Sequence, residues 1–132
     1  MHQFDLKNRT AVITGGAQGF GLDIARKFLN SGANVIIWDI DEKELQNAVK
    51  KINNPKLAYN IIDVSNFEKV NNTVIEINKS SNIDILINNA GITGPTAELW
   101  NYSINDWNKV VEINLNGTFN CCKSIVPNMV KN

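Results

Sequence analysis

The sequence predicts an α/β domain in which a doubly wound parallel sheet carries helices on both faces. Two observations support this prediction. Short apolar runs alternate with longer segments of helical periodicity, and the apolar runs recur about every 20 to 26 residues. Continuous apolar runs are typical of parallel strands that are buried on both faces. We therefore expect one domain with the order βαβαβαβα and right-handed crossovers.

The predicted strands are short and rich in β-branched residues. In chain order the elements are a strand over 10–14, a helix over 19–31, a strand over 34–39, a helix over 41–52, a strand over 57–62, a helix over 66–78, a strand over 83–87 and a long helix toward 129. The third strand is the least regular because Tyr59 and Asn60 interrupt its apolar run.

The helix boundaries follow from capping residues. Gly32 is suited to end the first helix. Asp41, with a glutamate three residues on, can cap the second. Ser65 is the expected cap of the third helix, and either Ser103 or Asn105 begins the fourth.

Composition excludes several classes of function. Lys and Arg total 13 and Asp and Glu total 13, so the net charge is zero and we expect no nucleic-acid partner and no anionic membrane surface. No apolar run approaches the ~20 residues that a membrane span needs. Residues 1–5 lack a cationic stretch followed by an apolar one, which predicts no signal peptide. The adjacent Cys121 and Cys122 cannot close a disulfide framework, which fits the reducing cytoplasm.

A glycine-rich turn joins the first strand to the first helix. Gly15, Gly16, Gly19 and Gly21 fall within residues 14–21. Glycines there let backbone N–H groups approach a pyrophosphate at a helix N-terminus. The alternative is a tight turn without a ligand, but so many glycines cost folding entropy that a plain turn does not require. A phosphate-loop NTPase would need Gly-Lys-Ser or Gly-Lys-Thr at the end of the turn, and the sequence has neither.

Two motifs together resemble the short-chain dehydrogenase/reductase family. One is Thr-Gly-x-x-x-Gly-x-Gly over residues 14–21, and the other is Asn-Asn-Ala-Gly over residues 88–91, each directly after a predicted strand. The resemblance covers the chain from about residue 6 onward and implies a Rossmann-type fold with a nicotinamide cofactor. The family's sheet continues beyond four strands, so the resemblance also implies that the remainder of the sheet is missing from this chain. The loop Gly91–Pro95 looks like those of the 3-oxoacyl-[acyl-carrier-protein] reductase and polyol or sugar dehydrogenase groups.

The end of the second strand bears on the choice of cofactor. Asp39 follows Gly21 by 18 residues, where an acidic residue can accept hydrogen bonds from the adenosine ribose. A carboxylate there also repels the 2′-phosphate of NADP. Gln18, Ile40 and Asp41 offer no basic side chain in exchange. The sequence therefore favours NAD over NADP.

The resemblance implies roles for further residues. Asp63 would bond the adenine amino group, Ile40 and Val64 would form apolar walls of the adenine slot, and Asn89–Gly91 would line the ribose side of the cofactor. The full set of expected cofactor-binding residues is Gly15, Gln18, Gly19, Phe20, Gly21, Asp39, Ile40, Asp63, Val64, Asn89, Ala90 and Gly91.

The long helix contains one residue of the family's catalytic set. Asn114 matches the catalytic Asn, and the resemblance implies that it holds a helix distortion and a water in a proton relay. The family's Ser and its Tyr-x-x-x-Lys pair are not found here. Tyr59 and Tyr102 each have an aspartate, not a lysine, four residues on. We therefore expect residues 1–132 to be the NAD-binding part of one domain, truncated before that region.

These observations favour an NAD-dependent oxidoreductase that interconverts a secondary alcohol and a ketone, on a small-molecule or acyl-carrier-bound substrate. The alternative is a dinucleotide-binding fragment without activity, because the catalytic Ser, Tyr and Lys are absent. Another doubly wound protein, such as a methyltransferase, leaves residues 88–91 unexplained. The complete protein is expected to be a homo-oligomer, a tetramer as is common in the family, and to need no metal.

Overall fold

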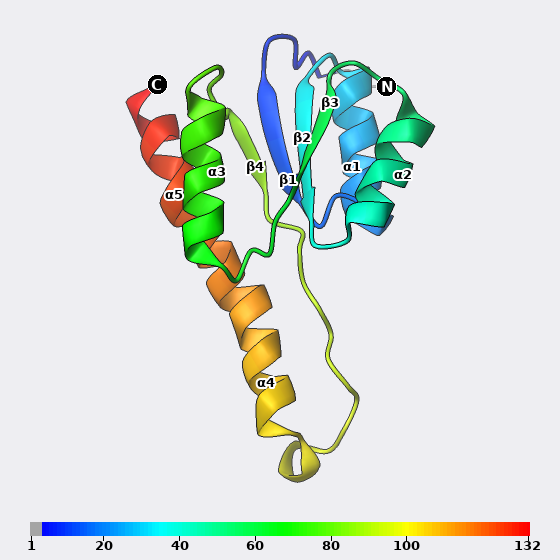
Figure 1. Cartoon of the computed structure of the whole chain (residues 1–132), viewed down its shortest axis with the longest axis vertical. Helices are drawn as coiled ribbons and strands as arrows, with labels where there is room; N and C mark the ends of the chain where they lie inside the picture. Colours follow the sequence, from blue (N-terminus) through cyan, green and yellow to red (C-terminus); the bar gives the residue numbers. More distant parts are fainter. Residues whose placement is uncertain (1–3) are drawn as a thin grey trace.

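The computed structural model describes residues 4–132, and strands and helices alternate along them in the predicted order. The elements are β1 (Thr10–Thr14), α1 (Gly19–Asn30), β2 (Asn34–Asp39), α2 (Glu42–Ile52), β3 (Leu57–Ile61), α3 (Phe67–Asn78), β4 (Ile85–Ile87), the 3₁₀ turn η1 (Leu99–Asn101), α4 (Ile104–Val111), the π-helical turn η2 (Glu112–Asn116) and α5 (Gly117–Lys131). Figure 1 shows the sheet between two helical layers, α1 and α2 on one face and α3 and α5 on the other. The predicted doubly wound fold is confirmed.

The strands are parallel and lie in the order β3-β2-β1-β4. β1 is central, and its Val12 pairs with Ile36 of β2 on one side and Leu86 of β4 on the other. The chain first winds outward from β1 to β3 and then returns to the opposite side of β1. Doubly wound sheets bind ligands at such a reversal, at the carboxyl ends of the strands. Within residues 4–132, β4 has a strand neighbour on one edge only, so the sheet is partial.

Neighbouring residues of β1 point into two separate cores. Ile13 belongs to the core beneath α1 and α2, together with Ala25, Leu29, Val35, Ile37, Leu45 and Ala48. Val12 belongs to the core beneath α3 and α5, together with Trp38, Ile62, Val64, Val70, Val74, Cys121 and Ile125. Each fully buried aliphatic side chain contributes about 1.5–3 kcal/mol. These two cores hold the strand ends in fixed positions.

The segment after β4 leads into the predicted long helix, which runs without a break from Ile104 to Lys131 and contains one π turn. Residues 88–103 run away from the carboxyl ends of the strands, and α4 returns beside them as an arm (Figure 1). Ser103 caps the N-terminus of α4, since its Oγ accepts a hydrogen bond from the backbone N–H of Asp106 at 3.3 Å. Glu112–Asn116 then form a turn of π-helix, so the helix distortion expected at Asn114 is present.

The predicted cap of the third helix and the predicted start of the fourth strand are wrong. Asn66, not Ser65, caps α3, because both the backbone N–H and the hydroxyl of Ser65 donate to Asp63. The Asn66 side chain accepts instead from the backbone N–H of Lys69 at 3.0 Å. The fourth strand begins at Ile85, not Ile83. Ile83 is buried in the core beneath α3 and α5, two residues before the pairing with β1 begins.

The adjacent Cys121 and Cys122 are both free thiols. Burial raises the pKa of the Cys121 thiol to about 12, with a smaller contribution from Cys122. Cys121 therefore remains a neutral thiol at ordinary pH and packs as a small apolar side chain.

Candidate functional site

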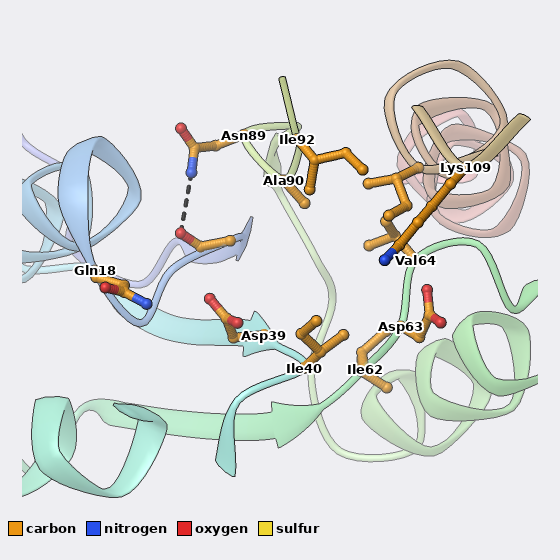
Figure 2. A pocket seen from close by; sticks show the side chains of 13 residues that line it. Gln18, Asp39, Ile40, Ile62, Asp63, Val64, Asn89, Ala90, Ile92 and Lys109 are labelled. Atoms are coloured by element: carbon orange, nitrogen blue, oxygen red, sulfur yellow. Dashed lines mark hydrogen bonds between the residues drawn. The ribbon is translucent and has the colours of Figure 1, made fainter. Parts of the chain in front are cut away.

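A cavity of about 370 Å³ opens at the carboxyl ends of the strands, and Figure 2 shows the side chains around it. Its walls come from the β1–α1 turn, the ends of β2 and β3, the loop after β4, and the α4–η2 segment. The lining residues are Gly15, Gln18, Asp39, Ile40, Ile62, Asp63, Val64, Asn89, Ala90, Gly91, Ile92, Lys109 and Ile113. Residues that are far apart in the sequence therefore meet where the strand order reverses.

The turn between β1 and α1 approaches the loop after β4 very closely. Gly15 adopts a left-handed backbone with φ of +62°, and a Cβ there would lie 2.9 Å from Asn89 Nδ2. A Cβ on Gly21 would collide with the carbonyl oxygen of Gly15 and lie 2.6 Å from the same Nδ2. Only glycine fits at both positions. The turn leads into the N-terminus of α1, where free N–H groups and the helix dipole favour an anion.

Thr14 and Asn89 tie these two loops together. Thr14 Oγ1 accepts hydrogen bonds from the backbone N–H groups of Asn89 at 3.0 Å and Ala90 at 2.9 Å, and donates to the Ile87 carbonyl at 3.4 Å. Asn89 Nδ2 donates to the carbonyls of Thr14 at 3.1 Å and Gly15 at 3.0 Å. Thr14 is only 1% exposed, so water cannot replace these bonds. The network fixes the distance between β1 and the loop after β4.

Asp39 stands at the end of β2 and is anchored by backbone groups. Its Oδ2 accepts from the N–H of Ala17 in the glycine turn at 3.3 Å, and its Oδ1 accepts from the N–H of Asp41 at 3.2 Å. Both bonds involve a partly exposed carboxylate, which keeps capacity to accept from a ligand. The adjacent Ile40 is 68% exposed at the rim of the cavity. Asp39 lies at the end of β2 beside the glycine turn, where the sequence places it; its role in ribose binding stays a prediction.

The residues after β3 form the opposite wall. Asp63 Oδ1 accepts from the backbone N–H and the hydroxyl of Ser65 at 2.9 and 2.6 Å. Val64 is buried, and its carbonyl accepts from Asn120 Nδ2 of α5 at 2.9 Å. A Cβ on Gly117 would lie 2.6 Å from Val64 Cγ2, so this glycine lets α5 pack closely against the wall. The helix that follows η2 thus positions Val64.

Asn114 is an exposed residue of the π turn, outside the cavity lining, and contacts the backbone of Ile92. Its Oδ1 accepts from the Ile92 N–H and its Nδ2 donates to the Ile92 carbonyl, both at 2.8 Å. This reciprocal pair joins the π turn to the loop after β4. Gly91 leaves the space for it, since a Cβ there would lie 3.1 Å from Asn114 Oδ1. The geometry makes Asn114 a positioning residue for Ile92; the proton-relay role stays a prediction.

The structure brings most of the expected residues to one place. Nine of the expected cofactor-binding residues line the cavity: Gly15, Gln18, Asp39, Ile40, Asp63, Val64, Asn89, Ala90 and Gly91. Gly19, Phe20, Gly21 and Asn114 are not among the lining residues, and Phe20 projects from the surface with 84% exposed.

Sequence reasoning missed four lining residues, namely Ile62, Ile92, Lys109 and Ile113. Ile62 directly precedes the expected Asp63, and Ile92 directly follows the expected Gly91. Their positions beside these residues were therefore a signal from which they could have been predicted. Lys109 and Ile113 had none, because helical periodicity does not reveal which loop a helix faces.

Replacing Asn114 with alanine should loosen the loop at Ile92. Both hydrogen bonds to the Ile92 backbone would be lost, and we expect its amide to exchange with solvent about fivefold faster, as measured by hydrogen exchange and NMR. Asn116→Ala is the matched control, since Asn116 lies on the same π turn and has no side-chain hydrogen bond among residues 4–132. Equal exchange rates in the two variants would contradict the positioning role.

The doubly wound sheet, the glycine turn at a helix N-terminus and the carboxylate at the end of β2 define a Rossmann-type class of α/β protein. Within that class, the chain belongs to the short-chain dehydrogenase/reductase family, whose short chain dehydrogenase model matches residues 9–132.

Three relatives illustrate the similarity. The chain is 34% identical over 130 residues to the 3-oxoacyl-[acyl-carrier-protein] reductase FabG of Chlamydia muridarum, covering 96% of this chain and 52% of the relative. It is 34% identical over 128 residues to the 2-dehydro-3-deoxy-L-rhamnonate dehydrogenase (NAD(+)) of a Sphingomonas species, covering 94% and 49%. Its fold matches Pseudomonas aeruginosa RhlG in an NADP active-site complex with a TM-score of 0.87 at 29% identity, covering 99% and 52%. The chain thus spans about half the length of these relatives.

Residues 4–132 lack both a membrane-spanning helix and a cluster of metal-binding side chains. No helix in this range is both long and apolar enough to cross a bilayer. The same residues contain no group of three or more His, Cys, Asp or Glu side chains placed to hold a metal ion.

Proposed function

We propose that this chain is the NAD-binding part of an oxidoreductase that interconverts a secondary alcohol and a ketone. The observation that carries the proposal is Asp39, which lines the cavity and accepts a hydrogen bond from the glycine turn. A carboxylate at this point is suited to bond the ribose hydroxyls of a dinucleotide. A bound nicotinamide would supply the hydride chemistry, and the protein would bind and orient it.

The proposal gives each wall of the cavity a task. The glycine turn and the N-terminus of α1 would receive the pyrophosphate. Ile40 and Val64 would hold the adenine between apolar surfaces, with Asp63 accepting from its amino group. Asn89 and Gly91 would border the ribose on the nicotinamide side.

NAD is proposed over NADP because of the charge of Asp39. The names of two relatives mention different cofactors, NAD(+) for the Sphingomonas dehydrogenase and NADP for the RhlG complex, so membership of the family leaves the choice open. Gln18, Asp39 and Ile40 line the cavity near the ribose position, and none is basic. A 2′-phosphate there would meet a carboxylate without a compensating cation.

Asp39→Ala should weaken the preference for NAD. We expect the ratio of the NADP and NAD dissociation constants to fall about tenfold, because both ribose binding and phosphate repulsion are lost, which isothermal titration calorimetry would measure. Asp23→Ala removes the same charge from an exposed position of α1 outside the cavity and serves as the control. An unchanged ratio of the NADP and NAD dissociation constants in Asp39→Ala would contradict the assignment of NAD.

We propose further that residues 1–132 are the first part of a longer domain, whose remainder carries the Ser and Tyr-x-x-x-Lys groups. Support comes from the one-sided pairing of β4 and from coverage of about half of each relative. The substrate of the complete protein would be acyl-carrier-bound, as the name of the Chlamydia relative suggests, or a sugar or polyol.

A dinucleotide-binding fragment without activity is the second candidate, favoured by the aspartates that follow Tyr59 and Tyr102 at the lysine position. The two candidates are separated by reading the source transcript beyond Asn132. A downstream Tyr-x-x-x-Lys supports the enzyme, and a stop codon directly after Asn132 contradicts it.

A homotetramer in the cytoplasm is proposed for the complete protein. Association between subunits is supported by the exposed apolar surface along α4, η2 and α5, where Trp107, Leu115 and Phe119 are each more than half exposed. Such residues are typical of surfaces that a partner subunit covers.

A further inference from the structure

One positively charged side chain faces the cavity. Lys109 projects from α4, and Figure 2 shows its ammonium group directed into the cavity toward Asp63 and Val64. It is the single Lys or Arg among the lining residues, which also include the carboxylates Asp39 and Asp63. None of the residues expected from the sequence to bind the cofactor is a cation, so this group has no assigned task.

The ammonium group of Lys109 is not engaged elsewhere in the described part of the chain. The ion pairs found across residues 4–132 are Arg9–Asp84 and Lys79–Glu76, and neither involves Lys109. Lys109 therefore lies more than 4 Å from both carboxylates of the cavity. Its three N–H donors remain available to a ligand.

The part of the cavity that Lys109 faces suits an aromatic base. An anionic pyrophosphate belongs at the N-terminus of α1, on the side of Gln18 and Asp39 (Figure 2). Away from that turn the lining becomes apolar, with Ile40 at the rim and Ile62 and Val64 only 2% and 6% exposed. A flat heterocycle would find apolar surfaces there and polar groups at its edge.

The polar groups at that edge are an acceptor and a donor. Asp63 Oδ1 is occupied by Ser65, whereas Oδ2 has no hydrogen bond among residues 4–132. Adenine presents an amino donor flanked by ring nitrogens that accept. A carboxylate oxygen beside an ammonium group complements that pattern.

We propose that Lys109 is a cofactor-contacting residue that donates a hydrogen bond to a ring nitrogen of the adenine base, beside Asp63. The inference rests on the proposed function, since it requires a dinucleotide in this cavity. Lys109 lies across the cavity from Asp39 and Gln18 (Figure 2), so it contacts the base and not a 2′-phosphate.

Three ligands test the proposal with the 132-residue chain: NAD, NADP and the uncharged nucleoside adenosine. Lys109→Met removes the donor and keeps most of the side-chain volume. We expect this substitution to lower the affinity for all three ligands by a similar factor of about five, which is the effect of losing one exposed charge-assisted hydrogen bond. Lys109→Arg should restore most of the affinity, and Lys131→Met, an exposed lysine of α5 outside the cavity, should change none.

The outcomes separate this inference from the function on which it rests. Failure of the unmodified chain to bind any of the three ligands overturns the dinucleotide site itself. If the unmodified chain binds but Lys109→Met binds equally well, only the Lys109 contact is overturned. If Lys109→Met binds NAD and NADP more weakly but binds adenosine with unchanged affinity, then Lys109 contacts the phosphates, and the base contact is also overturned. Circular dichroism melting of each variant checks that the exposed substitution leaves the fold intact.

Discussion

Thr14→Val is expected to lower the free energy of unfolding by about 3 kcal/mol. The substitution keeps the β-branched shape but removes Oγ1, which accepts from the backbone N–H groups of Asn89 and Ala90. Because Thr14 is 1% exposed, neither N–H gains water in exchange. Each buried donor that is left unsatisfied costs about 1–3 kcal/mol. Urea denaturation monitored by tryptophan fluorescence would measure the loss.

Thr14→Ser supplies the matched control. Serine keeps the hydroxyl and loses only a methyl group, so it should cost about 1 kcal/mol. A shape-based role for Thr14 predicts the reverse ranking, with valine tolerated and serine harmful. If valine proves as stable as threonine, then Thr14 Oγ1 does not hold the two loops together.

The effect of Thr14→Val should extend to the proposed cofactor site. Asn89, Ala90 and Gly91 line the cavity, and the first two are fixed by Thr14. Their release should weaken NAD binding as well as the fold. A drop in stability with unchanged NAD affinity would show that the loop after β4 adds little to the cofactor site.

Local signals explain how much of this fold the sequence predicts. The apolar runs of β1 and β2 are buried on both faces, and the runs alone place these strands correctly. Asp41 caps α2 as predicted, because its side chain needs only the N–H of Glu44 three residues on. The prediction that Ser65 caps α3 failed for an equally local reason, because the Ser65 hydroxyl donates a hydrogen bond to Asp63.

What the sequence could not predict depends on distant contacts. The π turn at Glu112–Asn116 leaves no mark in the apolar periodicity, and family resemblance alone suggested a distortion at Asn114. Lys109 reaches the cavity because the arm after β4 returns to the end of β3, and Asn120 holds α5 against Val64. Such pairings are set by packing between elements, which a helical pattern does not specify.

Gly21→Ala should be the most damaging substitution for the proposed cofactor site. The new Cβ would collide with the Gly15 carbonyl and lie 2.6 Å from Asn89 Nδ2. Neither neighbour can move freely, because Asn89 Nδ2 donates to both Gly15 and Thr14. The glycine turn must therefore shift, at a cost of about 3 kcal/mol in stability and more than about tenfold in NAD affinity.

Gly19→Ala tests the same turn without the collision. A Cβ on Gly19 meets no atom within 4 Å, and the only penalty is its left-handed backbone, with φ of +58°. That strain costs roughly 1–2 kcal/mol, and the groups that line the cavity stay in place. Urea denaturation of both variants should thus show the larger loss of stability for Gly21→Ala. NAD affinity is not the readout for this pair, because Gly19 is itself an expected cofactor-binding residue at the N-terminus of α1. Comparable losses in the two variants would mean that backbone strain, and not the close approach of Gly21 to Gly15 and Asn89, governs the site.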